Sequence, residues 1–170
     1  MQESPLILVR RQVARKYPTL LAQHPLNDRN NDEDRLQYLA LLAFSLAVGR
    51  EPSPVESTAF TAFAERIGIP EHEALEQLGQ RASLDWDTLE ILLQTLQMHQ
   101  LHWAWLMDVV WQQSMDGKTH ADDVAVVAEL ANHWEIKQSW LVDFRQWAEW
   151  LRAREYQHAQ KIAKTIKNYF

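Results

Sequence analysis

The chain has 170 residues, enough for one domain with a single hydrophobic core. With 46% hydrophobic and 24% charged residues and a net charge of -6, it is not a globally disordered chain. Cysteine is absent, which excludes disulfides and thiolate chemistry and fits a reducing compartment. Glycine and proline are few and no long stretch alternates with period two, so we expect an all-α protein.

The charge is unevenly distributed. Arginine and lysine gather in residues 1–16 and 151–170, whereas the stretch between them is strongly acidic. The basic ends therefore either pack against the acidic body or meet an anionic partner such as a membrane surface. The acidic body argues against a nucleic-acid partner. No stretch suits a membrane span and the start lacks the charge order of a secretory signal, so we expect a cytoplasmic protein.

In chain order, the first expected element is a helix over residues 5–23, interrupted by Pro18. A polar connector follows over residues 24–34. Residues 34–48 are apolar on most sides, which is typical of a helix in the centre of a bundle.

A helix start follows at Ser53-Pro54-Val55-Glu56. Serine suits the N-cap, proline suits the first helical position, and the glutamate completes a capping box. This helix is expected to end at Gly68, and a third helix is expected from Pro70 to Gly79. A linking helix then begins near Asp85, with an apolar face made of Leu89, Leu92, Leu93 and Leu96.

The pattern then recurs. An apolar helix runs into Asp116-Gly117, where glycine suits a left-handed helix end, and Thr119 with Asp122 predicts a capping box for the next helix. Gly117 repeats Gly49. At a spacing one residue shorter, three further positions recur, namely Glu56 as Asp123, Phe63 as Leu130 and Ile69 as Ile136. The difference is one inserted loop residue, which costs little.

We therefore expect a pseudo-duplicated helical bundle of two three-helix units, with a linking helix and helical extensions at both ends. Three parts are expected in the chain: an N-terminal helix and connector over 1–31, the duplicated domain over 32–144, and a basic amphipathic C-terminal helix over 145–170, packed on the domain or extending from it.

These turns resemble the TerB-like family of tellurite-resistance proteins. The resemblance spans roughly residues 34–144 and rests on Gly49, Ser53–Glu56, Phe63–Ile69, Met115–Thr119, Asp122-Asp123 and Val127–Ala131. It implies an all-helical, non-enzymatic interaction or adaptor module in a bacterial stress-response or envelope-linked system. Some family members resemble acidic metal-binding proteins. Val48 departs from the pattern because the second unit has Asp116 at that place.

A divalent-cation site is the alternative that the residues themselves raise. Four carboxylates near the second turn, Asp108, Asp116, Asp122 and Asp123, are the ligand type that hard cations such as calcium prefer. Their spacing does not match an EF-hand, and the last three are equally explained as helix-end and helix-dipole residues. The pair His99 and His102 is weak as a zinc motif and is expected on the surface.

Catalytic motifs are missing from the sequence, with no phosphate-binding glycine loop and no nucleophile elbow. A protein partner is therefore expected. Trp103 and Trp105 point about 200° apart on a helix, so one of them is a candidate contact residue. The basic C-terminal residues Lys161, Lys164 and Lys167 are the candidates for a partner or an anionic membrane surface.

Overall fold

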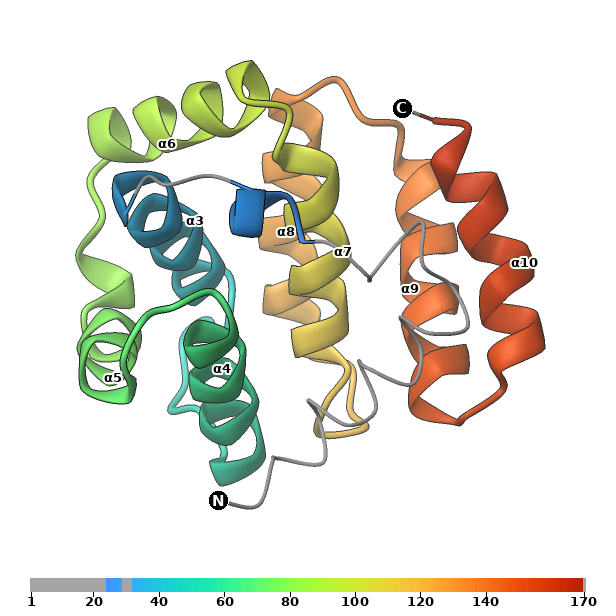
Figure 1. The fold of residues 1–170 in the computed structure, drawn as a ribbon, viewed down its shortest axis with the longest axis horizontal. Coiled ribbons are helices and arrows are strands. Elements are labelled where there is room, and N and C mark those ends of the chain that lie inside the picture. The colour runs from blue at the N-terminus through green and yellow to red at the C-terminus, as the bar shows by residue number, and fades with distance from the viewer. Residues whose placement is uncertain (1–23, 29–31, 170) are drawn as a thin grey trace.

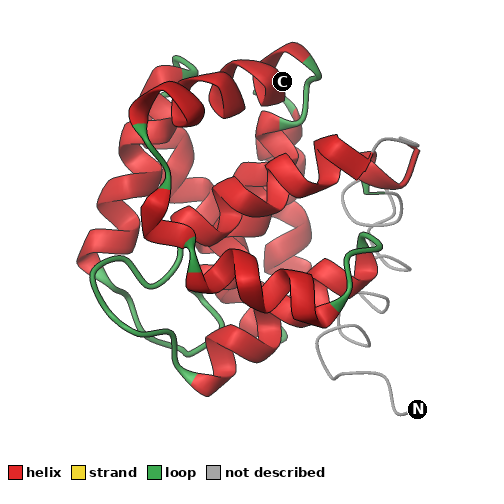
Figure 2. Ribbon diagram, turned by 90° about the vertical axis from the view of Figure 1, so that its left-hand side faces the viewer, coloured by secondary structure: helices red, strands yellow, loops and turns green. Residues whose placement is uncertain are grey.

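The structure is a computed structural model. It describes residues 24–28 and 32–169, without the side chains of Asn27, Asp28, Tyr156 and Lys167. This part of the chain is helical and has no strand (Figure 2), which confirms the all-α prediction. The helix expected over residues 5–23 lies outside the described residues. None of the described helices is long and apolar enough to cross a membrane.

The described part begins with the 3-10 helix η1 (Pro25–Asp28). The α-helices are, in chain order, α3 (Asp32–Phe44), α4 (Pro54–Arg66), α5 (Glu71–Gly79), α6 (Trp86–Met98), α7 (His102–Gln113), α8 (Ala121–His133), α9 (Gln138–Arg152) and α10 (Tyr156–Lys167). A second 3-10 turn, η2 (Arg81–Ser83), connects α5 to α6.

Two helix starts are as the sequence predicts. The backbone N–H of Glu56 donates to Ser53 Oγ at 3.2 Å, and the N–H of Ser53 donates to Glu56 Oε2 at 2.7 Å, so α4 has its capping box. Asp85 caps α6 by accepting from the N–H of Thr88 at 2.7 Å. The four leucines predicted for the inner face of α6 are all buried.

The start of α8 differs from the prediction. Gly117 has the expected left-handed backbone, with φ +73°. However, the N-cap residue is His120, and no side chain caps the helix. The capping box expected from Thr119 and Asp122 is therefore wrong. His120 has extended backbone angles, so the helix begins one residue later than a Thr119 cap requires.

One continuous core holds the helices together. The central helix is α7, which contacts α3, α4, α6, α8 and α9. In Figure 1, α6 runs across the upper ends of α3 and α7, while α9 and α10 lie side by side at the right-hand edge. The largest fully buried side chains are Trp105, Tyr38, Phe60, Phe63 and Phe144.

The C-terminal region is a hairpin of two helices. The predicted single helix over residues 145–170 is wrong, because the chain reverses at Arg154, whose φ is +62°. The expected boundary at residue 144 falls inside α9. Helix α10 packs on α9 and buries Ala159, Ala163 and Ile166, so this amphipathic segment docks on the bundle.

Candidate functional site

The loop before α4 and the start of α8 meet at one guanidinium group. Arg50 Nη1 and Nη2 donate to Glu56 Oε2 and Oε1 at 2.8 and 2.6 Å, and Nη2 also donates to Asp123 Oδ2 at 3.0 Å. Asp123 Oδ1 accepts from the backbone N–H of Val48 at 2.9 Å. The exposed fractions of Glu56 and Asp123 are only 3% and 1%. Two buried carboxylates thus depend on a single cation.

This arrangement favours the charged forms of Arg50 and Glu56. The hydrogen bonds from Arg50 lower the pKa of the Glu56 carboxyl to about 2, against the opposing effect of burial. The bond to Glu56, assisted by the charge of Asp123, raises the pKa of the Arg50 guanidinium. Arg50 was not among the residues that the sequence suggested for a site. A long-range ion pair leaves no local sequence signal that could have identified it.

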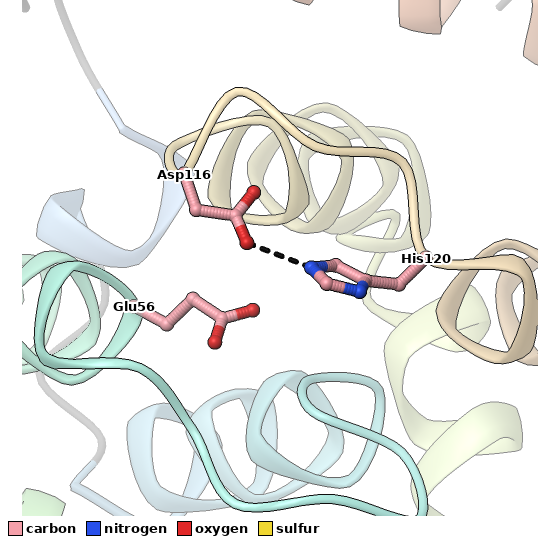
Figure 3. A group of neighbouring side chains, drawn as sticks. All are labelled: Glu56, Asp116 and His120. Carbon is pink, nitrogen blue, oxygen red and sulfur yellow. Dashed lines mark hydrogen bonds and ion pairs between the residues drawn. The ribbon is translucent and has the colours of Figure 1, made fainter.

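Beside this ion pair lies a second acidic group at the 116–120 turn. His120 Nε2 lies 2.7 Å from Asp116 Oδ2, and the N–H of Lys118 donates to Asp116 Oδ1 at 2.9 Å. Figure 3 shows that Glu56 points toward this pair from α4. Glu56, Asp116 and His120 offer ligand atoms that all lie within 4.8 Å of one another. Of these three residues, the sequence suggested only Asp116 as a ligand.

The ligand types of this group suit a divalent cation, since two carboxylates and an imidazole are common zinc ligands. Both oxygens of Glu56, however, already accept hydrogen bonds from Arg50. A metal ion that used Glu56 would have to displace the guanidinium or share a carboxylate with it at close range. The positive charge that Glu56 needs is therefore supplied by Arg50.

The other predicted metal ligands are dispersed. Asp122 is exposed in the first turn of α8, while Asp123 is buried on Arg50. Asp108 has different partners, since its Oδ2 lies 2.7 Å from His24 Nε2 and accepts from the Tyr38 hydroxyl at 2.5 Å. These contacts fix Asp108 in the core, so grouping it with the Asp116 turn is wrong.

The same contacts correct the expectation of a polar connector after residue 23. His24 and Leu26 are both buried, and the N–H of Leu26 donates to His24 Nδ1 at 3.2 Å. The start of this segment is therefore a packed part of the core, held by the long-range bond to Asp108.

The histidine pair on either side of the α6–α7 connection is not a surface pair. His99 Nδ1 lies 3.2 Å from Asp34 Oδ1. The imidazole of His102 packs against Trp134 with ring centres 5.6 Å apart, and burial lowers its pKa. The surface prediction is wrong because Asp34 of α3 and Trp134, the residue after α8, partly cover these two side chains.

The exposure of the tryptophans differs from the prediction that Trp103 or Trp105 contacts a partner. Trp105 is completely buried and packs edge-on against Trp134, so it cannot contact a partner of the folded chain. Trp103 is partly buried against the core. Trp86 is instead the exposed tryptophan, with 83% of its surface accessible.

The sequence does contain a pattern that predicts exposed apolar residues on α6. Ile91 and Met98 are seven residues apart and fall opposite the leucine stripe in a helical projection. Both are exposed, by 58% and 73%.

The candidate lysines lie on the docked helix α10. Lys161 and Lys164 are exposed, whereas the side chain of Lys167 lies outside the described part of the chain. The face between α9 and α10 is closed by two stacked ring pairs, Trp150 on His158 and Trp140 on Tyr169, with ring centres 4.6 and 4.3 Å apart. The exposed lysines therefore remain accessible to a partner.

Comparison of the chain with known protein families, with curated proteins and with solved structures found no match.

Proposed function

We propose that this protein is a non-enzymatic interaction module that binds a protein partner through the outward face of α6. The observation that carries the proposal is the concentration of exposed apolar side chains on that helix. Of the six large hydrophobic residues that are exposed in the described part of the chain, three, Trp86, Ile91 and Met98, belong to α6. Single exposed apolar residues are common on protein surfaces, but several on one helix, including a tryptophan, are typical of an interface.

The charges around this face define the chemistry of the partner. Residues 71–98 contain six carboxylates but only one arginine. That arginine, Arg81, donates to the backbone carbonyls of Leu78 and Arg50. Ile91 and Met98 share the outward face of α6, and Trp86 lies at its first turn, about 120–140° round the helix axis. Exposed apolar residues on a helix that also carries carboxylates suit an amphipathic segment whose apolar residues are flanked by lysine and arginine.

The wider assignment rests on the repeated turns. Glu56 and Asp123 are each the third residue after a helix N-cap. The carbonyls of Ala64 and Ala131 accept from the N–H groups of Ile69 and Ile136 at 2.8 and 2.9 Å, so α4 and α8 end in the same way. These correspondences support a pseudo-duplicated bundle of two three-helix units. With the resemblance described above, they support a TerB-like adaptor of a stress-response or envelope-linked system.

A divalent-cation site is the second candidate function. It is favoured by the proximity of Glu56, Asp116 and His120 and opposed by the bond between Arg50 and Glu56. A membrane-binding role for the exposed lysines of α10 is the third, and it is tested by the vesicle binding described below.

The test compares three forms of the protein as baits in an extract of the organism that encodes it. One is the wild type, one is the triple variant Trp86→Ser, Ile91→Ser, Met98→Ser, and the matched control is Val142→Ser, which removes an equally exposed apolar side chain from α9. Proteins retained by the wild type and the control but lost from the triple variant are purified and titrated calorimetrically. We expect about a hundredfold loss of affinity for the triple variant.

Two results would overturn the proposal. The first is a purified partner that binds the triple variant as tightly as the wild type. The second is binding of the wild type to anionic lipid vesicles that is lost in the Lys161→Gln, Lys164→Gln variant, with no protein partner that depends on α6. That outcome would replace protein binding with attachment to a membrane surface.

A further inference from the structure

A pocket of about 80 Å³ opens beside the turn at Gly117. Its walls come from the end of α7, the start of α8 and the second half of α9. This volume has room for a few water molecules or one tetrahedral oxyanion, and it is far below the roughly 300 Å³ that drug-sized ligands need. The pocket lies at the opposite end of α7 from α6, so it is a separate feature from the proposed protein-binding face.

Three cationic side chains line this pocket: Lys118, Arg145 and Arg152. The guanidinium of Arg152 lies over the turn, because a Cβ at Gly117 would come within 3.4 Å of its Nη1. Lys118 and Arg152 are exposed, and Arg145 is half-buried. Within the described part of the chain, none of the three has a carboxylate at ion-pair distance. The described residues thus give none of these three cations an ion-pair partner.

The half-buried position of Arg145 makes this lack of a counter-ion costly. Burial lowers the pKa of its guanidinium, since no described carboxylate offsets the loss of hydration. A bound anion at this position would supply the missing counter-charge. This is the reverse of the situation at Arg50, where two carboxylates raise the pKa of the guanidinium.

The start of α8 adds donors to the same pocket. Thr119 and His120 form part of its wall, and α8 has no side-chain cap, whereas α4 is capped by Ser53. The first backbone N–H groups of a helix have no partner within the helix and carry the positive end of its dipole.

Two carboxylates also belong to the pocket wall, and they differ in how strongly they would repel a bound anion. The charge of Asp123 is already bound by Arg50 and by the N–H of Val48. Glu149 is exposed and is the carboxylate that remains to oppose an anion. Three cations and the end of a helix therefore face one free carboxylate.

From this convergence of cations on a small pocket, we infer that the site formed by Lys118, Thr119, Arg145 and Arg152 binds a phosphoryl dianion. The group is either free inorganic phosphate or the phosphate of a small phosphomonoester, because the charge and size that the pocket selects are the same.

The experiment follows the backbone amide signals of the full chain by NMR while inorganic phosphate is added at constant ionic strength. Sodium chloride serves as the control for salt, and a sugar phosphate serves as the second probe. We expect saturable shifts of the amides of Gly117, Lys118 and Ala121. Tighter binding of the sugar phosphate identifies a phosphomonoester as the ligand, and equal or weaker binding identifies the free ion.

Variants make the assignment specific. Arg152→Gln and Lys118→Gln change exposed residues and should each weaken binding by about tenfold. Glu149→Gln, which removes the opposing charge, should strengthen binding. The matched control Lys161→Gln removes an exposed charge from α10, outside the pocket, and should leave phosphate binding unchanged. Shifts that chloride reproduces, or that persist unchanged in Arg152→Gln and Lys118→Gln, would overturn the inference.

Discussion

Glu56 and Asp123 occupy the same position in two helices, the third residue after the N-cap, and one guanidinium, that of Arg50, bonds to both. A carboxylate at this position ordinarily caps its own helix and stays hydrated. Here both carboxylates are buried, and the shared cation ties the loop before α4 to the start of α8. The ion pair is therefore a polar link between α4 and α8, and its removal has measurable consequences.

The first prediction concerns Glu56 and pH. Because its pKa falls to about 2 in the folded protein from an ordinary value of 4.5, ionised Glu56 stabilises the fold above about pH 4.5. That contribution is lost as the pH falls from about 4.5 toward about 2. At pH 7, Glu56→Gln should lower the free energy of unfolding by about 2 to 3 kcal/mol.

Urea unfolding of both proteins between pH 7 and pH 3 checks this expectation. The difference between wild type and Glu56→Gln should shrink steadily at the acidic end. Glu65→Gln, which changes an exposed glutamate of the same helix, is the control and should have little effect at either pH. A Glu56→Gln penalty that is independent of pH would show that packing, and not charge, is responsible.

The second prediction concerns Arg50 and divalent cations. Arg50→Met leaves two buried carboxylates without a counter-ion and should lower the free energy of unfolding by about 3 to 5 kcal/mol. With the guanidinium gone, Glu56, Asp116 and His120 become available to a metal ion. Zinc should therefore raise the melting temperature of Arg50→Met and leave that of the wild type unchanged.

Calorimetric melting with and without zinc measures this effect. The double variant Arg50→Met, His120→Ala should lose the response, since the imidazole ligand is removed. A saturable zinc response of the chelator-treated wild type that disappears in His120→Ala would instead support the metal-site alternative.

The third prediction compares two glycines. Gly117 has φ +73°, and a Cβ there would lie 3.4 Å from Arg152 Nη1, so Gly117→Ala should destabilise the fold by about 1 to 2 kcal/mol. Gly79 is the last residue of α5, and a Cβ there meets no atom within 4 Å. Gly79→Ala should stabilise the fold slightly, by about 0.5 kcal/mol or more. Chemical unfolding of both variants checks the opposite signs, and equal effects would contradict the argument.

The fourth prediction separates two tryptophans. Trp105 is fully buried, and Trp105→Ala should cost about 3 to 5 kcal/mol of stability through the cavity that it leaves. Trp86 is 83% exposed, so Trp86→Ser should leave the stability nearly unchanged. The fluorescence spectrum of Trp86, obtained by subtracting the spectrum of Trp86→Ser from that of the wild type, should be red-shifted, as for a hydrated indole. A loss of stability in Trp86→Ser comparable with that in Trp105→Ala would show that Trp86 belongs to the core.

Local signals in the sequence predicted much of the fold. The serine, proline and glutamate at residues 53–56 are close neighbours in the chain, so their capping box could be recognised directly. The leucine face of α6 and the left-handed Gly117 were predictable for the same reason. Chain reversals that use no glycine could not be predicted. Gln100, Glu135 and Arg154 all have positive φ, and no pattern in the sequence marks Arg154 as the break between α9 and α10.

The candidate site was harder to predict because tertiary contacts assemble it. Arg50 meets Asp123 across 73 positions of the chain, and His24 meets Asp108 across 84. Residue types and spacing cannot show such pairs. Asp108 and Asp116 therefore looked like members of one acidic cluster, although the fold assigns them to the core and to a loop. The position of His120 as a possible metal ligand could not be predicted for the same reason, because Glu56 approaches it from another helix.

The most direct test of the proposed function is hydrogen–deuterium exchange of the chain, free and bound to the partner that depends on α6. We predict slower exchange within residues 86–98, where Trp86, Ile91 and Met98 become covered, and unchanged exchange over α9 and α10. Protection confined to α9 and α10, with α6 unaffected, would contradict the assignment of α6 as the binding face.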